Sequence, residues 1–179
     1  QEGMYDYLQY LKNCGIKIGV VTNRSREFLA HELKSVEQGR WQNLFDVTLC
    51  GDEARRYKPA PDSLQQAVEA VDESMSQHVW YVGDSVTDMA TASQAGNTSI
   101  FYNGALWDSD WFAHMFPYDE DHYQGPDCIV EDFDHLLDVV VNSIERCERR
   151  SEFTLPGTRP KRMPQRQLPP ARQEPDWHP

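Results

Sequence analysis

The stretch His78–Gly96, HVWYVGDSVTDMATASQAG, decides the fold of this chain. It begins with an apolar run at 79–82, which is typical of a buried strand. A glycine breaks that run, and the pattern that follows predicts a helix ending at the last glycine of the stretch. Asp84 and Asp88 therefore lie at the carboxyl end of a strand and beside a helix N-terminus, where open α/β sheets place their ligand sites.

Similar pairs of strands and helices occur on both sides of this stretch. Apolar periodicity predicts further helices over 2–15, 25–39, 62–71 and 133–150, and further strands over 16–21, 45–50, 98–102 and 128–130. Strands that alternate with helices at this spacing form βαβ units with a parallel sheet. The sequence therefore predicts an α/β fold.

Two of these helices have recognisable starts. Ser25 is expected to cap the helix over 25–39, and Asp62 or Ser63 is expected to cap the next one. The inner face of the helix over 25–39 is expected to hold four apolar residues: Phe28, Leu29, Leu33 and Val36.

The chain is predicted to hold one domain and a tail. Residues 1–150 are long enough for a single core. Segment 105–127 interrupts the strand and helix rhythm with aromatic and acidic residues, which are expected to pack on the sheet edge or to contact a partner. Residues 151–179 are rich in Pro and Arg and are predicted to be disordered, because they cannot bury enough apolar surface to fold.

Charge and composition narrow the function classes. The 179 residues carry a formal net charge of −12, and residues 1–155 alone are near −15. Such an acidic body repels nucleic acids and anionic membranes, so neither is an expected partner. No apolar run is long enough to span a membrane, and the four cysteines lie far apart, so we expect reduced thiols and a cytoplasmic protein.

Polar side chains follow three of the predicted strands. Thr22 and Asn23 end one strand, Lys58 lies in the loop after the next, and Asp84 and Asp88 follow a third. In a parallel sheet these strand ends share one edge, so the side chains can converge. A hydroxyl, an amide and an ammonium group suit phosphoryl oxygens, and paired carboxylates suit Mg²⁺. Each signal alone could be a capping turn, an exposed loop lysine or a helix cap; together they predict Mg²⁺-dependent phosphoryl transfer.

The ordered set of motifs resembles the haloacid dehalogenase-like hydrolase superfamily, and within it the phosphoglycolate phosphatase-like branch. The resemblance covers about residues 1–104, with a weaker echo in the last strand and helix. It rests on these matches to the second, third and fourth family motifs: Val20–Asn23, Lys58–Asp62 and Val82–Asp88, continued by Ala92 and Ala95–Gly96. It implies a three-layer Rossmann-like core with a parallel sheet.

The resemblance also implies roles for the site residues. Thr22 would hydrogen-bond the phosphoryl group with help from the Asn23 backbone. Lys58 would neutralise developing charge and hold the carboxylate of the nucleophile. Asp84 would bind Mg²⁺, and Asp88 would bind it or orient its waters. The implied partner is a small phosphorylated metabolite, with phosphoglycolate as the family's default, and the oligomeric state is not predicted.

The sequence departs from the family pattern at the first motif, which is a strand followed by Asp-x-Asp-x-Thr or Ser. Its first Asp is the nucleophile, and the motif would belong upstream of residue 1, together with a helical cap. The missing strand would sit between the strand ending at Thr22 and the strand ending at Val82, so those strands would leave a gap or close on each other. The chain as given is therefore expected to be inactive. Three Asp-x-Asp triplets lack the required context: 108–110, 119–121 and 132–134.

Two other functions compete with the phosphatase. The block Gly83–Asp88 also resembles the nucleophile block of Gly-Asp-Ser-Leu esterases, in which Ser85 would be the nucleophile and His135 its base. That reading leaves Thr22 and Lys58 unexplained. The third possibility is a non-catalytic domain of the haloacid dehalogenase type that binds a partner.

Overall fold

The computed structural model describes residues 3–117 and 125–152, and the side chains among them up to residue 144. Residues 1–142 form one compact unit, and residues 143–179 form a second. The tail predicted to be disordered, residues 151–179, lies outside the described residues except for 151–152. Residues 118–124 of the aromatic and acidic segment also lie outside them. The elements in chain order are α1 Met4–Asn13, β1 Gly19–Val21, α2 Arg26–Ser35, a 3-10 turn Val36–Gly39, β2 Val47–Leu49, α3 Asp62–Glu69, β3 Trp80–Gly83, α4 Val86–Ala95, β4 Thr98–Tyr102, α5 Ser109–Met115, β5 Cys128–Val130 and α6 Phe133–Glu152.

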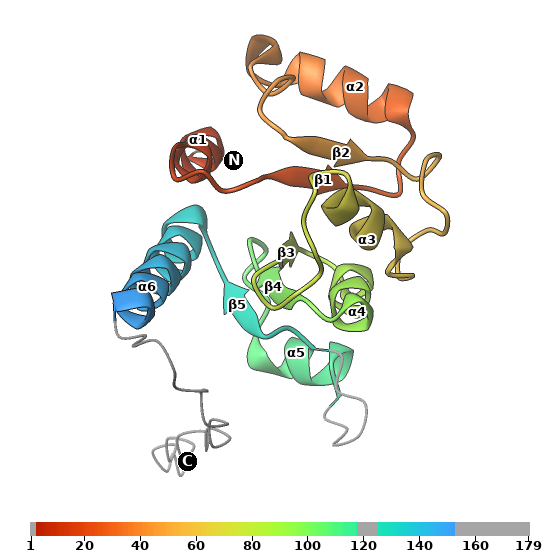
Figure 1. Ribbon diagram of the computed structural model, residues 1–179. Coiled ribbons are helices and arrows are strands. Elements are labelled where there is room, and N and C mark those ends of the chain that lie inside the picture. Colours follow the sequence, from red (N-terminus) through yellow and green to blue (C-terminus); the bar gives the residue numbers. More distant parts are fainter. Residues whose placement is uncertain (1–2, 118–124, 153–179) are drawn as a thin grey trace. The chain divides into compact units, whose positions relative to one another are not determined.

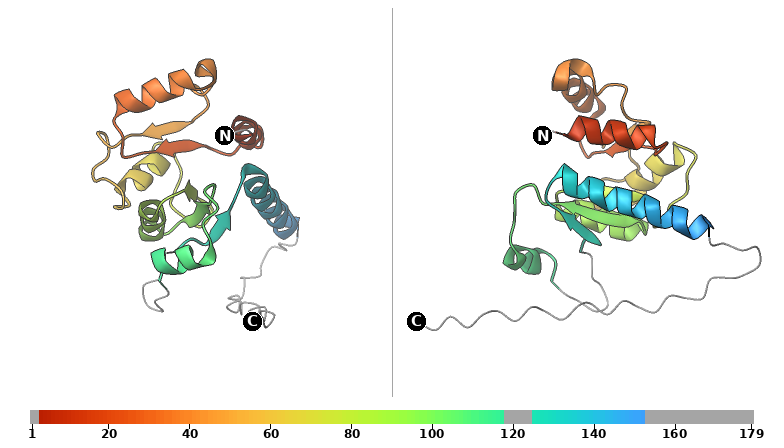
Figure 2. Two further views of the ribbon diagram at one scale, coloured as in Figure 1. Left: turned by 180° about the vertical axis from the view of Figure 1, so that it is seen from behind. Right: turned by 90° about the vertical axis from the view of Figure 1, so that its left-hand side faces the viewer.

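All described strands pair in parallel, in two separate sheets (Figures 1 and 2). β1 pairs with β2, and β3, β4 and β5 form a sheet in that order. The register aligns Gly83 with Phe101, so the carboxyl ends of β3 and β4 lie side by side. The predicted α/β fold with parallel strands is confirmed. β1 and β3 do not pair with each other, so each keeps one edge without a strand partner among the described residues.

Two clusters of buried side chains hold these sheets and their helices together. Met89 of α4 packs with Phe101 of β4 and Phe116 after α5, and none of the three is more than 9% exposed. A second cluster joins Leu64 of α3, Tyr81 of β3 and a buried alanine of α4. α3 contacts both β1 and β2 as well as α4, so it links the elements around the two sheets.

Helix boundaries follow the predicted capping residues in two cases. The Ser25 side chain accepts a hydrogen bond from the backbone N–H of Phe28, as an N-cap does. Gly96 ends α4 with φ 74°, a left-handed conformation that suits glycine. The prediction for α3 was wrong: Pro61 occupies the cap position, and Asp62 is the first helical residue. The Asp62 carboxylate instead pairs with Arg56, so it is not free to cap the helix.

The inner face predicted for α2 was also wrong in part. Leu29 is buried, but Phe28 is 49% exposed and Val36 is 43% exposed. Phe28 lies about 100° around the helix from Leu29, at the margin of the apolar stripe, and its ring packs under the guanidinium of Arg24 instead. Val36 lies beyond the end of α2, where the backbone turns extended.

Candidate active site

The loops that follow β1, β2 and β3 meet at one place through side-chain contacts. The Asn23 amide makes two hydrogen bonds to the backbone of Lys58: Lys58 N–H donates to Asn23 Oδ1 at 2.9 Å, and Asn23 Nδ2 donates to the Lys58 carbonyl at 3.3 Å. The Lys58 side chain in turn reaches Asp88 at the start of α4. The structure therefore brings together the polar groups of the three loops.

The Lys58 ammonium group is held by three acceptors. Its Nζ donates to Asp88 Oδ1 at 2.7 Å, to the Tyr81 hydroxyl at 3.0 Å and, more weakly, to the Val21 carbonyl at 3.4 Å. An ammonium group has three protons, so all three are used. The side chains of Lys58 and Asp88 are only 13% and 9% exposed, so this is a buried ion pair.

The two predicted metal-binding carboxylates differ in their surroundings. Asp88 Oδ1 accepts from Lys58 and Tyr81, and Asp88 Oδ2 accepts from the Ser85 hydroxyl at 2.7 Å, so both of its oxygens are engaged. Burial raises the pKa of Asp88, but the hydrogen bonds from Lys58 and Ser85 outweigh it, and the net pKa lies below its ordinary value. Asp84 is exposed, and its carboxylate makes no hydrogen bond or ion pair within the described part of the chain.

The Thr22 hydroxyl accepts one hydrogen bond and can still donate one. Thr22 Oγ1 accepts a hydrogen bond from the backbone N–H of Arg24 at 3.2 Å, which leaves its own proton free to donate. The Thr22 backbone N–H is bonded to the Leu49 carbonyl, which ties the end of β1 to β2. The Asn23 side chain is engaged by Lys58, so its amide positions the lysine loop.

Tyr81 also contributes to this site and was not among the predicted site residues. Its hydroxyl lies 3.1 Å from Asp88 Oδ1, and burial, followed by the charge of Asp88, raises its pKa above the ordinary range. A signal was present in the sequence: a tyrosine two positions before Gly83 faces the same side of the strand as that glycine. A polar-tipped ring in an apolar strand needs a hydrogen-bond partner when it is buried.

Gly83 allows Asp88 to approach the strand. A Cβ at this position would lie 2.4 Å from the Asp88 Cβ, which is closer than such atoms come in proteins. We expect Gly83→Ala to push Asp88 away from Lys58 and to lower the free energy of unfolding by about 1–3 kcal/mol, as overpacking does. Urea unfolding measures this. Thr87→Ala is the control, because Thr87 is an exposed residue of α4 beside the same motif; an equal loss in both variants would contradict the prediction.

The residues of the esterase alternative are not hydrogen-bonded to each other in the described structure. The Ser85 hydroxyl donates to Asp88 and also accepts from the Asp88 backbone N–H, as a helix cap does. His135 lies in the first turn of α6, where its backbone N–H donates to Asp132. The hydroxyl that this alternative would use as nucleophile is therefore bonded to a carboxylate and not to a histidine.

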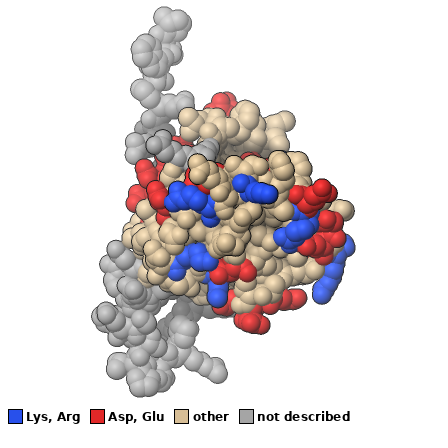
Figure 3. All heavy atoms as spheres, turned by 90° about the horizontal axis from the view of Figure 1, so that it is seen from above, with Lys and Arg blue, Asp and Glu red and all other residues tan. Residues whose placement is uncertain are grey.

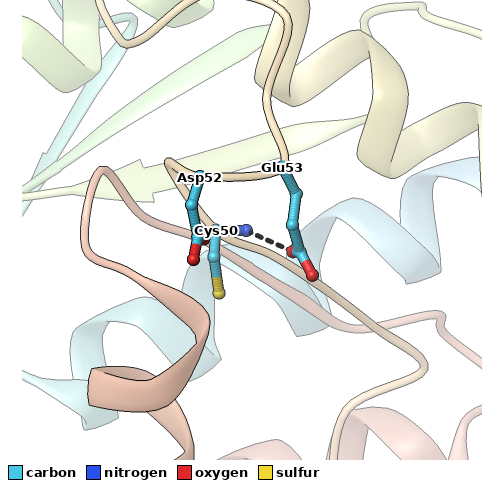
Figure 4. Close-up of side chains that lie close together, drawn as sticks. All are labelled: Cys50, Asp52 and Glu53. Carbon is cyan, nitrogen blue, oxygen red and sulfur yellow. Dashed lines mark hydrogen bonds between the residues drawn. The ribbon is translucent and has the colours of Figure 1, made fainter.

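A second group of possible ligand atoms lies after β2 (Figure 4). The thiol of Cys50 and the carboxylates of Asp52 and Glu53 come within 4.8 Å of one another. Arg26 already engages both acids: its guanidinium binds Glu53, and its backbone N–H donates to Asp52. Glu53 also accepts from the Cys50 backbone N–H at 3.0 Å. The cluster therefore fastens the start of α2 to the loop after β2, and its oxygens are not free for a metal.

The described basic residues lie in the first third of the sequence. Every Lys and Arg side chain that the structure describes lies before residue 59, and four of them stand on the loops after β1 and β2: Arg24, Arg55, Arg56 and Lys58. Figure 3 looks down on the molecule from the side of α2, where basic side chains gather among acidic ones. Three of these four side chains are paired with a carboxylate: Arg24 with Glu32, Arg56 with Asp62 and Lys58 with Asp88. The described helices include none long and apolar enough to cross a membrane.

Comparison with known proteins identifies a matching family and several relatives. The family model described as haloacid dehalogenase-like hydrolase matches residues 1–102. Pyrophosphatase PpaX of Bacillus mycoides is 28% identical over 139 residues, which are 78% of this chain and 59% of the relative. The protein of the same name from Bacillus thuringiensis is 30% identical over 105 residues, 59% of this chain and 47% of the relative. The chain thus spans only about half to three fifths of the length of these curated relatives.

Solved structures agree on the fold. A haloacid dehalogenase-superfamily hydrolase from Ehrlichia chaffeensis superposes with a TM-score of 0.62 at 22% identity, covering 80% of this chain and 58% of that one. A phosphatase of the same superfamily from Thermococcus onnurineus gives 0.61 at 21% identity, covering 78% and 57%. Because the family model covers more than half of the residues and includes the Thr22, Lys58 and Asp84 motifs, the chain belongs to the haloacid dehalogenase-like hydrolases.

Proposed function

We propose that this chain carries the phosphate-binding and metal-binding part of a Mg²⁺-dependent phosphatase that hydrolyses a small phosphomonoester. The observation that carries the proposal is the buried Lys58–Asp88 pair, held by Asn23 and Tyr81 where the three loops meet. A fixed cation beside free hydroxyl and carboxylate groups is what phosphoryl transfer needs, because catalysis there is mostly positioning and charge stabilisation.

In this proposal Thr22 and Lys58 hold the phosphoryl group. Thr22 donates its free hydroxyl proton to a phosphoryl oxygen. Lys58 turns one of its three N–H bonds toward the substrate, and the bond to the Val21 carbonyl is the easiest to give up because it is the longest, at 3.4 Å. Asp88 and Tyr81 keep the ammonium group in place during this exchange. Asn23 fixes the backbone from which the lysine side chain extends.

Asp84 is the residue of this site best suited to bind Mg²⁺. Mg²⁺ takes hard oxygen ligands, keeps several waters and is commonly held by one or two carboxylates. Asp84 is exposed and uncommitted at the end of β3, whereas both oxygens of Asp88 are engaged. Asp84 is therefore the proposed ligand. Asp88 is proposed to hold the Lys58 ammonium group and to accept a hydrogen bond from Ser85 instead of binding the metal. When bound, the ion supplies positive charge near the phosphoryl oxygens.

The nucleophile is proposed to be an aspartate of a strand upstream of residue 1. Two features support this: β1 and β3 each have an edge without a strand partner among the described residues, and the relatives are considerably longer than this chain. A parallel strand between those edges would join the two sheets into one and complete a three-layer core. The aspartate at its carboxyl end would attack the phosphorus, form an aspartyl-phosphate and release the alcohol, and water would then release phosphate.

The substrate is proposed to be a small phosphorylated metabolite. Phosphoglycolate is the default of the resembling branch, and the curated relatives are named as pyrophosphatases. Both molecules place a second anionic group beside the phosphoryl group. Arg55, which makes no ion pair among the described side chains, supports an anionic substrate of this kind.

The test compares this 179-residue chain with the longer polypeptide encoded by the reading frame that continues upstream of Gln1. We expect phosphate release from phosphoglycolate or pyrophosphate with Mg²⁺ only from the longer polypeptide. Asp84→Asn should weaken the apparent Mg²⁺ affinity, read from the Mg²⁺ dependence of the rate, by about tenfold to a hundredfold. Losing an outer partner of a metal ligand already costs this much. Asp6→Asn on α1 is the control, since Asp6 is exposed and belongs to another element.

Robust turnover by the 179-residue chain alone would contradict the upstream nucleophile. An upstream sequence without Asp-x-Asp followed by Thr or Ser would instead favour the non-catalytic domain. Equal Mg²⁺ dependence in Asp84→Asn and the parent would remove Asp84 from the metal site.

A further inference from the structure

A cavity lies at the amino edge of the sheet of β3, β4 and β5, the edge opposite to the one that carries Asp84. Its volume is about 180 Å³, and its lining includes Gln77 before β3, Asn97 before β4 and Asp127 before β5. The strands are parallel neighbours, so these three residues lie at the same edge. Gln77 and Asp127 are exposed, so solvent reaches the rim of the cavity.

Asn97 brings a buried acceptor without a donor to this cavity. The residue is 3% exposed, and its Oδ1 has no hydrogen-bond partner in the part of the chain that the structure describes. Its Nδ2 donates to the Thr98 carbonyl at 3.1 Å, which fixes the orientation of the amide, because exchanging O and N would bring two carbonyl oxygens together. A buried acceptor without a donor is costly and rare in folded proteins. The Asn97 oxygen therefore indicates a donor that the chain itself does not supply.

The other polar side chains of the lining add further acceptor oxygens. Asp127 Oδ2 accepts from the backbone N–H and from the hydroxyl of Ser99, both at 2.8 Å, whereas Asp127 Oδ1 has no donor among the described residues. Gln77 Oε1 accepts only a weak hydrogen bond, from the Thr98 hydroxyl at 3.3 Å. The Gln77 Nε2 donor is already used by the Gly96 carbonyl at 2.9 Å. The cavity therefore offers oxygen lone pairs and one carboxylate charge.

The charges around the cavity favour a cation. α4 ends at Ala95, so the negative end of its dipole lies at this edge of the sheet. No Lys or Arg occurs between Lys58 and Arg146, and none is among the residues that line the cavity. The Asp127 carboxylate accordingly makes no ion pair within the described part of the chain.

We propose that this cavity binds a small organic cation through a primary ammonium group. Such a group carries three N–H donors and no acceptor, which complements the free oxygens of Asn97 and Asp127 and the weakly bonded oxygen of Gln77. The cavity is several times larger than the share of about 30 Å³ that one water takes in the liquid, so it also has room for a short alkyl chain. The inference does not rest on the proposed function, because the phosphatase site lies at the other edge of the sheet.

The test titrates the isotope-labelled 179-residue chain with the four-carbon diamine putrescine and follows the backbone amide signals of Asn97, Ser99 and Asp127 by NMR. The four-carbon diol of the same length is the neutral control. Tetramethylammonium chloride, a cation without an N–H donor, keeps the ionic strength constant. We expect saturable shifts of these signals with the diamine and none with the diol. No shift with the diamine, or equal shifts with the diol, overturns the proposal. Shifts that potassium chloride reproduces at the same concentration overturn the ammonium group as the ligand and assign the cavity to a metal ion.

A pair of variants tests the carboxylate. Asp127→Asn should weaken the diamine roughly tenfold to a hundredfold, the loss expected for one hydrogen bond between charged groups. The amide oxygen of this variant can still accept from Ser99, so the local fold is preserved. Glu131→Gln is the matched control: it neutralises an exposed carboxylate beyond the other end of β5 and should leave the affinity unchanged. Equal affinities in Asp127→Asn and the parent chain overturn the site, and the titration of the parent chain decides the proposal even where a variant does not fold.

Discussion

Replacing Lys58 with methionine is expected to lower the free energy of unfolding by about 3–5 kcal/mol at neutral pH, the cost of leaving a buried charge without its partner. Asp88 would keep only the Tyr81 and Ser85 hydroxyls as hydrogen-bond donors, because the 2.7 Å contact with the ammonium group would be lost. Urea unfolding followed by tryptophan fluorescence measures the loss. Lys12→Met is the control: the Lys12 side chain is 31% exposed, pairs with Asp46 at a longer 3.5 Å and donates to the Leu44 carbonyl, so a smaller loss than at Lys58 is expected.

The pH dependence gives this prediction a second readout. The pKa of Asp88 is lowered in the folded chain, so its contribution to stability is present at neutral pH and is lost as the pH falls through that lowered value. Without Lys58, burial would raise the pKa of Asp88, and the carboxyl group would become neutral at a higher pH. The difference in stability between the parent and the variant should therefore begin to shrink as the pH falls through the raised pKa of the variant, and it should be smallest below the lowered pKa of the parent. A difference that stays constant down to low pH would contradict the ion-pair explanation.

Phe101→Ala is expected to lower the free energy of unfolding by about 3–5 kcal/mol, the usual cost of emptying a buried phenylalanine site. Phe101 is 1% exposed and makes tilted or edge-on ring contacts with Trp111, Phe112 and Phe116. The near-ultraviolet circular dichroism of the tryptophans should also decrease, because Trp111 loses its neighbour in β4. Urea unfolding and circular dichroism are the two measurements.

The same substitution at Phe28 serves as the control for Phe101. Phe28 is 49% exposed, and its main contact is the Arg24 guanidinium, 4.5 Å from the ring centroid. A cation–π contact at an exposed site contributes about 0.5–1 kcal/mol, so Phe28→Ala should have a small effect. Similar losses at both positions would mean that the aromatic cluster around α5 is not a stable part of the core.

The meeting of the three loops could be predicted from the sequence because it depends on topology. Once strands and helices alternate, the carboxyl ends of parallel strands share an edge, and Asn23, Lys58 and Asp88 follow three such ends. The cap at Ser25 and the stop at Gly96 could be predicted for a local reason, since each depends on its own few residues. The chemical roles of these residues remain proposals.

What the sequence did not predict depends on distant contacts. The position of Tyr81 in its strand indicates that its hydroxyl needs a partner, but not that the partner is Lys58, and nothing indicates that Arg26 would fasten the loop carrying Glu53. The apolar pattern of α2 included Phe28, but periodicity describes an ideal stripe and not the neighbours that cover it. The different surroundings of Asp84 and Asp88 were likewise invisible, because both are acids in the same short motif.

The edges of β1 and β3 that have no partner strand among the described residues also affect how copies of this chain behave toward one another. A strand edge without a partner strand is a template for pairing with another molecule, which is a recognised route to aggregation, although the Val21 carbonyl of β1 already accepts from Lys58 and Tyr81. The net charge of −12 opposes such encounters by repulsion between copies. Because salt shortens the range of that repulsion to about 10 Å at 0.1 M, ionic strength becomes the condition that decides the colloidal stability of this chain in solution.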